Sequence, residues 1–296
     1  MKNKKYLYLI ISAVIILAGV ISICIQGLNL GIDFRGGTLL SVGFNSEIDN
    51  QKVTDIITQA GGKDVKIQKS TGNNYEIRFY TDENIEASDI RDDIREALEK
   101  EYGKSATGKE ITTSFDTVSA TASRELVIAA FWTVALAVVC MLVYISLRFE
   151  WTFGIATVAG LMHDILITLA FMSILQVQLN STFIAAMLTI VGYAINNTIV
   201  IFDRVRENNK KYDVKTYTRE FVVKTSVKES FRRTLFSSLT TLFTIGALCV
   251  FGVTSVREFA LPIIIGIISS IYSCMFINPF IWEFIAEKRS AKKKNA

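Results

Sequence analysis

The chain has 296 residues, of which 50% are hydrophobic and only two are proline, and its formal net charge is +4. A chain this apolar is not an ordinary soluble protein. The one histidine, His163, excludes a histidine-rich metal site. The four cysteines all fall in apolar runs, so they predict neither a disulfide framework nor metal-ligand spacing. These cysteines are Cys24, Cys140, Cys249 and Cys274.

Six apolar runs are long enough to cross a bilayer as helices, which takes about 20 residues. They are Tyr6–Gln26, Leu126–Leu147, Trp151–Leu175, Thr182–Phe202, Leu235–Val253 and Phe259–Phe284. Lys2, Lys4 and Lys5 precede the first run, which is longer than the apolar region of a cleaved signal peptide. It therefore predicts an uncleaved signal anchor, and the chain is predicted to be a polytopic α-helical membrane protein.

The distribution of Lys and Arg along the chain predicts its orientation in the membrane. Lys and Arg are dense before the first span, in segment 203–234, which holds ten of them from Arg204 to Arg233, and in tail 285–296. By the positive-inside rule, residues 1–27 begin in the cytoplasm, and the basic loop 203–234 and the tail are cytoplasmic. Residues 28–123 then lie outside the cell, and 124–284 hold the remaining five spans. The basic segments also suit contact with membrane lipid, although a topology signal alone explains them equally well.

The outer segment 28–123 alternates short strand and helix patterns in the order β-α-β-β-α-β, which is typical of the ferredoxin-like α+β fold. The expected elements are strand Ile32–Phe44, helix 51–60, strands 64–68 and 75–80, helix 88–102 and strand 111–118. Four apolar side chains are expected to be buried on the sheet: Ile56, Ile57, Ile94 and Leu98. The segment contains no histidine or cysteine, and the pair Gly36-Gly37 predicts a turn or bulge rather than a phosphate loop.

The third span carries a carboxylate near its centre. Thr157, Gly160, Asp164 and Thr168 follow helical spacing on one face. A charged side chain at that depth costs about 2.5–3.5 kcal/mol on insertion scales, so Asp164 must be protonated, paired or hydrated. An interhelical hydrogen bond and a protonatable relay fit equally well. His163 points about 100° away on the helix and is not required as the partner of Asp164.

The fourth and fifth spans carry further polar side chains. Asn196 and Asn197 lie within the apolar fourth span, which leaves the membrane near Asp203. Such amides need another helix or a polar cavity, because hydrocarbon offers no hydrogen-bond partner. On the fifth span, Arg233 begins a face that continues with Ser237, Thr241 and Thr244. This face predicts either a hydrated path or a simple interfacial anchor at Arg233.

Five motifs resemble the SecF family, whose members are the smaller membrane component of the bacterial SecD–SecF complex. They are GIDFRGGT (31–38, with Gly31, Asp33, Gly36 and Gly37), LMHDILIT (161–168), GYAINNTIVIFDRVREN (192–208), FRRTLFSSLTTL (231–242) and IGIISSIYS (265–273). The resemblance extends over the whole chain, with six spans and one outer domain after the first.

The resemblance implies an RND-like accessory subunit of the Sec translocase in the cytoplasmic membrane. Its partners would be SecD, the SecYEG channel and unfolded preproteins, and the energy would come from a proton or sodium gradient. It implies no enzymatic activity, no nucleic acid and no cofactor other than transported H⁺ or Na⁺. The alternatives are a half-transporter exporting small molecules or lipids on the same architecture, and an assembly factor without transport activity.

One residue departs from the family pattern. The family usually has Asn-Asp where this chain has Asn196-Asn197. The resemblance implies that this aspartate, the arginine matching Arg233 and an aspartate from SecD form the ion-coupling site. Since an amide cannot titrate, either the carboxylate of SecD or Asp164 takes its place, or the coupling ion or stoichiometry differs, or coupling is lost.

Overall fold

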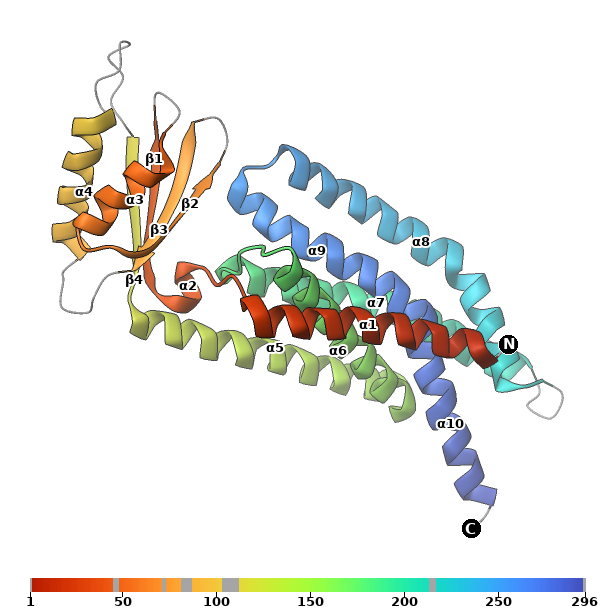
Figure 1. Cartoon of the computed structure of the whole chain (residues 1–296). Coiled ribbons are helices and arrows are strands. Elements are labelled where there is room, and N and C mark those ends of the chain that lie inside the picture. Colours follow the sequence, from red (N-terminus) through yellow and green to blue (C-terminus); the bar gives the residue numbers. More distant parts are fainter. Residues whose placement is uncertain are drawn as a thin grey trace. The chain divides into compact units, whose positions relative to one another are not determined.

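The computed structural model describes residues 2–44, 48–70, 73–80, 87–102, 112–212 and 217–294. The chain divides into two units (Figure 1). One unit combines residues 1–29 and 131–296 and consists of helices, and the other comprises residues 30–130 and contains the sheet. Each unit has its own hydrophobic core.

Within the described ranges, six helices are long and apolar enough to cross a membrane, which confirms the predicted number of spans. The sixth span consists of α9, the five-residue π-helix η1 and α10, which follow one another without a break. The helices are α1 (Lys2–Gln26), α5 (Ala120–Arg148), α6 (Trp151–Ile174), α7 (Ser181–Lys211), α8 (Arg219–Phe251), α9 (Thr254–Tyr272), η1 (Ser273–Ile277) and α10 (Asn278–Lys294).

Helices α6, α7 and α9 form the centre of the bundle. Half or more of each of their spans is buried, against 17% or less for α1, α5 and α8. Two glycines allow close approach between helices, because a Cβ atom on Gly19 would overlap Ala170 and one on Gly266 would overlap Ile190. Small residues at such crossings are what membrane helices need, since packing rather than water drives their association.

The segment 203–234, predicted as a basic loop, is mostly helical. Helix α7 continues to Lys211 and α8 begins at Arg219, so both helices extend well beyond their apolar parts. The Arg204 guanidinium joins the two extensions, with Nη1 2.5 Å from Glu207 and Nε 2.7 Å from Glu229. The error arose because apolar periodicity was used to end the helices, whereas charged side chains stabilise the continuation.

The sheet unit has the ferredoxin-like order β-α-β-β-α-β, with the strands arranged β2-β3-β1-β4 and every neighbouring pair antiparallel. This confirms the predicted α+β fold class. Its elements are β1 (Gly37–Gly43), α3 (Asn50–Gln59), β2 (Lys63–Lys69), β3 (Asn74–Tyr80), α4 (Ala87–Tyr102) and β4 (Thr112–Val118), preceded by the single turn α2 (Ile32–Arg35). Of the four side chains expected in the core, Ile57, Ile94 and Leu98 are buried, and Ile56 is partly buried.

The residues before the glycine pair form a helical turn rather than the start of a strand. Helix α2 covers Ile32–Arg35, Gly36 ends it with φ +81°, and Gly37, at φ +120°, begins β1. A Cβ atom on Gly37 would lie 2.9 Å from the carbonyl oxygen of Phe79. Both glycines adopt backbone conformations that other residues rarely adopt, and the turn predicted at Gly36-Gly37 is present.

We expect Leu98→Asp to unfold the sheet unit, because Leu98 is completely buried and an unpaired carboxylate there costs several kcal/mol, a large part of a domain's stability. Limited proteolysis of the full chain should then cleave the unit rapidly. Lys100→Asp introduces the same side chain at an exposed position of α4 and should leave the digestion pattern unchanged. Equal resistance of both variants would show that this face of α4 is not in the core.

Candidate functional site

The polar face of α6 lies inside the helix bundle. Thr157, Asp164 and Thr168 are each exposed by 1% or less, and a Cβ atom on Gly160 would overlap the amide of Asn278. The two threonine hydroxyls donate to carbonyl oxygens of their own helix. Asp164 is therefore the member of this face whose side chain forms hydrogen bonds with other helices in the described part of the chain.

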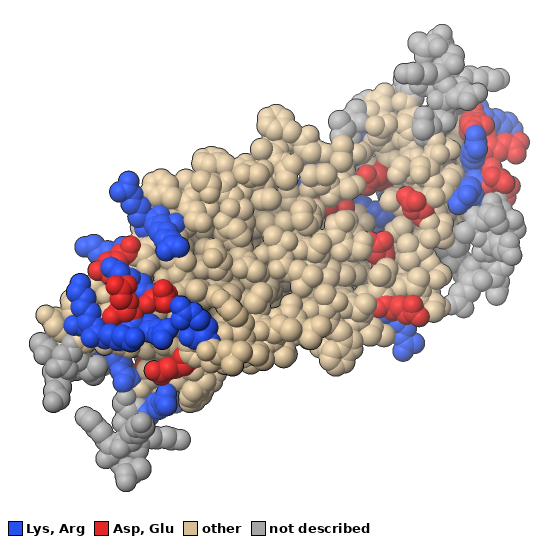
Figure 2. Space-filling view, turned by 180° about the vertical axis from the view of Figure 1, so that it is seen from behind, with Lys and Arg blue, Asp and Glu red and all other residues tan. Residues whose placement is uncertain are grey.

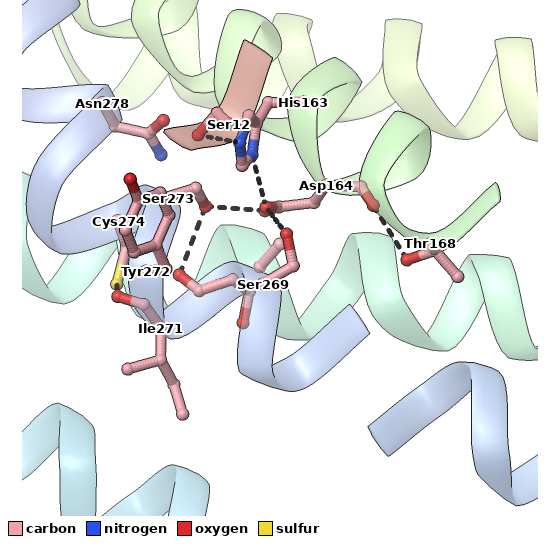
Figure 3. A network of polar contacts seen from close by, with 12 residues as sticks. Ser12, His163, Asp164, Thr168, Ser269, Ile271, Tyr272, Ser273, Cys274 and Asn278 are labelled. Carbon is pink, nitrogen blue, oxygen red and sulfur yellow. Dashed lines mark hydrogen bonds and ion pairs between the residues drawn. The ribbon is translucent and has the colours of Figure 1, made fainter. Parts of the chain in front are cut away.

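The Asp164 carboxylate accepts hydrogen bonds from α9 and from η1 (Figure 3). Ser269 of α9 donates to Oδ1 at 2.6 Å, and Ser273, the first residue of η1, donates to Oδ2 at 2.7 Å. His163 places Nδ1 3.1 Å from Oδ1, so the adjacent histidine contacts Asp164 despite its different direction on the helix. The other ring nitrogen lies 2.9 Å from the hydroxyl of Ser12 in α1.

The hydrogen bonds continue from Asp164 towards Asn197. The Ser273 hydroxyl, whose one hydrogen is shared with Asp164, also lies 3.3 Å from the carbonyl oxygen of Ser270, and the Asn197 amide donates to the Ser270 hydroxyl at 3.2 Å. Asn197 also donates to Ser238 of α8 at 3.3 Å. A buried polar band thus crosses α1, α6, α9, α7 and α8; its members are Ser12, His163, Asp164, Ser269, Ser270, Ser273, Asn197 and Ser238.

The structure separates the other predicted site residues from this band. Asn196, Asp203 and Arg233 are exposed. Within the described ranges, neither the Asn196 amide nor the Arg233 guanidinium makes a hydrogen bond or ion pair. Asp164 and Asn197 therefore belong to one buried network, whereas Asn196 and Arg233 are exposed and have no polar partner among the residues that the structure describes.

The sequence motif GIDFRGGT belongs to the sheet unit. Gly31 caps the start of α2, Asp33 lies in its first turn, and Gly36 and Gly37 make the turn into β1. These residues shape the backbone and lie in a different unit from the polar band.

Sequence reasoning missed the serines and Asn278. Ser269, Ser270 and Ser273 share a serine-rich turn, and this spacing signals a polar helix face, yet hydroxyls are tolerated in membrane helices without any role. Asn278 donates to Thr198 at 2.8 Å and is 1% exposed. Its helix has a π-turn immediately before it, and such turns are frequent at functional sites.

The serine hydroxyls around Asp164 can hydrogen-bond to either protonation state of its carboxyl group. The described part of the chain contains no group of three or more His, Cys, Asp and Glu side chains close enough to hold a metal ion. Hydroxyls both donate and accept, so Ser269 and Ser273 can donate to an ionised carboxylate or accept from a protonated one. The band can therefore remain hydrogen-bonded in both protonation states of Asp164.

Two family models match the chain. The model for the C-terminal part of the protein export membrane proteins SecD and SecF matches residues 97–288. The model for the SecD/SecF GG motif matches residues 21–47, which include the Gly36-Gly37 turn.

The similar proteins include separate and fused forms. Protein translocase subunit SecF of Sebaldella termitidis is 34% identical over 99% of this chain and 94% of its own length. Protein translocase subunit SecDF of Bacillus subtilis is 33% identical over 99% of this chain but 38% of its own length. The crystal structure of SecDF from Thermus thermophilus, described as a translocon-associated membrane protein, has a TM-score of 0.81 and 28% identity over 97% of this chain and 38% of that one.

We expect Gly160→Ala to destabilise the bundle by about 1–3 kcal/mol, because the new methyl group displaces the Asn278 amide from a packed site. A thermal unfolding scan of the purified chain in detergent should show a lower melting temperature by several degrees. Gly246→Ala adds the same methyl group where nothing lies within 4 Å and should not lower it. Identical melting curves for the two variants would contradict the close contact between α6 and α10.

Proposed function

We propose that this chain, which belongs to the SecF family of protein translocase subunits, works with SecD to drive preprotein export. The energy for this work would come from an ion gradient. The chain is an accessory subunit of the Sec protein translocase and a multi-pass membrane protein. The matched proteins are named as translocase subunits, which agrees with a transport role and leaves the small-molecule or lipid exporter without support.

Association with SecD follows from the fused relatives, of which this chain covers 38%. Two side chains support α7 and α8 as the contact surface. Asn196 and Arg233 are exposed in spans that cross hydrocarbon, where an unsatisfied polar group costs several kcal/mol. A carboxylate of SecD beside Arg233 would satisfy the guanidinium, and the resemblance implies such an aspartate.

Asp164 is proposed to carry the coupling ion in this subunit. Among the described residues it is the most completely buried carboxylate, and its hydrogen-bond partners suit both of its protonation states. Asn197 holds its place in the same band through Ser238 and Ser270, but an amide cannot bind and release a proton. The titrating group is therefore Asp164 in this chain, while Arg233 pairs with the partner's carboxylate.

The orientation of the chain in the membrane is also part of the proposal. The proposed cytoplasmic position of both termini is supported by the basic extensions of α7 and α8 and by the basic tail, and the sheet unit would then lie outside the cell. There the sheet unit would meet the emerging preprotein, and the subunit would act beside the SecYEG channel. The transported ion is H⁺ or Na⁺, and no other cofactor is proposed.

Arg233→Ala should abolish gradient-stimulated export while SecD still copurifies. Moving one charge through 100 mV is worth about 2.3 kcal/mol, enough to shift a conformational equilibrium about fiftyfold. The measurement is export of a precursor into membrane vesicles under an imposed proton or sodium gradient. Arg232→Ala, which removes the neighbouring guanidinium, should export normally; normal export by Arg233→Ala under both gradients would leave Arg233 as an interfacial anchor only.

Asp164→Asn should reduce gradient-driven export at least tenfold if Asp164 titrates, since the amide keeps the size of the side chain but not its charge. Asn197→Asp should be tolerated, because the serines that contact Asn197 can also donate to a carboxylate. In that background, Asp164→Asn should cost less export than it does alone. Unchanged export by the Asp164→Asn single variant would assign titration entirely to the partner.

A further inference from the structure

The helix bundle also contains a polar cavity, separate from the buried band around Asp164. It has a volume of about 780 Å³ and lies where α5 ends and α6 begins, with further walls from α7, α8 and α10. The lining residues are Leu147, Arg148, Phe149, Glu150, Thr152, Phe153, Arg206, Asn209, Lys210, Arg219, Trp282, Ala286 and Arg289.

The lining is strongly basic, with five Lys or Arg side chains and one carboxylate. That carboxylate, Glu150, lies 3.4 Å from Arg289 and neutralises one of them. The guanidinium groups of Arg148 and Arg206 lie 5.4 and 5.8 Å from the centre of the Phe149 ring, and neither forms an ion pair within the described ranges. Figure 2 shows Lys and Arg gathered at the end of the bundle where α7 ends and α8 begins.

The lining of the cavity also includes two hydrogen-bonding groups without a partner among the described residues. Thr152 and Trp282 line it and are 1% and 4% exposed, yet the Thr152 hydroxyl and the Trp282 indole N–H have no partner within the described part of the chain. Helix α6 begins at Trp151, and its N-cap residue Glu150 makes no capping hydrogen bond with its side chain. The first N–H groups and the positive end of a long helix therefore lie at a site lined by cations.

The position of the cavity indicates which anion it would meet. Arg148 ends one membrane-crossing helix and Trp151 begins the next, so the turn between them lies at the membrane surface. Phe149, Phe153 and Trp282 add aromatic walls, and aromatic side chains are typical of the headgroup level. Basic pockets between membrane helices at this level suit anionic headgroups.

We propose that this cavity binds the phosphate of an anionic phospholipid headgroup. Arg148, Arg206 and Lys210 would surround the phosphate, with Thr152 and Trp282 able to donate to its oxygens. The apolar walls would contact the glycerol backbone and the first carbons of the acyl chains, which a free phosphate ion lacks. The site thus selects a lipid by charge and apolar contact together.

Trp282 can report on the site. The chain has three tryptophans, so replacing Trp132 and Trp151 by Phe in the full chain leaves Trp282 as the sole tryptophan, which can be excited selectively at wavelengths that tyrosine does not absorb. The purified chain in neutral detergent is titrated with dioctanoyl phosphatidylglycerol, dioctanoyl phosphatidylcholine and inorganic phosphate. We expect a saturable change in Trp282 fluorescence with phosphatidylglycerol and little change with the other two.

The variant Arg148→Gln/Arg206→Gln should bind phosphatidylglycerol about 25-fold more weakly, since each basic residue near an anionic lipid contributes about a fivefold factor. Lys228→Gln/Arg232→Gln removes two charges from exposed positions of α8 outside the cavity and should bind as the parent does. Arg148→Lys/Arg206→Lys keeps the charge, and its binding should lie closer to the parent than that of the glutamine variant.

Three results would overturn the proposal. Equal affinity of the parent and the glutamine variant would remove the cavity as the binding site, and native mass spectrometry of lipid retained by both proteins provides a second readout. Equal binding of phosphatidylcholine would remove the role of charge. Saturation by inorganic phosphate, with displacement of the lipid, would assign the cavity to a soluble phosphate compound.

Discussion

Hydrocarbon supplies no hydrogen bonds, and this constraint accounts for the arrangement of the helix bundle. The Asp164 carboxylate can exist at the centre of a span because Ser269 and Ser273 donate hydrogen bonds to it and the His163 ring lies within hydrogen-bond distance. Those side chains come from α6, α9 and η1, the buried centre of the bundle. Glycines allow close crossings in the same part of the bundle, because Gly160 of α6 meets Asn278 of α10 and Gly266 of α9 meets Ile190 of α7. Packing and hydrogen bonding therefore depend on the same small set of helix crossings.

The same constraint makes this chain one part of a larger unit. The buried band satisfies Asn197 but leaves Asn196 and Arg233 exposed, and lipid cannot replace the missing partners. This chain covers 38% of the fused relatives, so those proteins carry a further portion in the same chain. In the proposed coupling, the ion site must respond to the position of the partner. Asp164 and Asn197 both connect to Ser270 of α9, the first through Ser273 and the Ser270 carbonyl and the second through the Ser270 hydroxyl, so a shift of α9 would affect both side chains.

The sequence was sufficient to predict the membrane spans and the buried carboxylate, because long apolar runs and isolated charged residues within them can be recognised without a structure. Long apolar runs indicated the six spans, and an isolated carboxylate in one of them marked Asp164. Periodicity failed where charge pairs continue a helix, so Arg204 and Glu229 were assigned to a loop although they join two helices. Spacing also could not show that Asn197 and Asp164 share one network, because Ser270 and Ser273 connect them from a helix more than 70 residues away from Asn197. Nor could spacing tell Asn196 from Asn197, whose opposite exposures depend on which helices pack against α7.

The central claim is that the α7–α8 face bearing Asn196 and Arg233 is covered by SecD. A photo-crosslinking amino acid placed at position 196 in intact membranes tests it most directly, with Leu17, an exposed apolar residue of α1, as the comparison site. We expect ultraviolet irradiation to join position 196 to SecD in high yield and position 17 to lipid or to nothing. Crosslinking of position 196 to lipid alone, together with purification of this chain as a functional monomer, would contradict the claim.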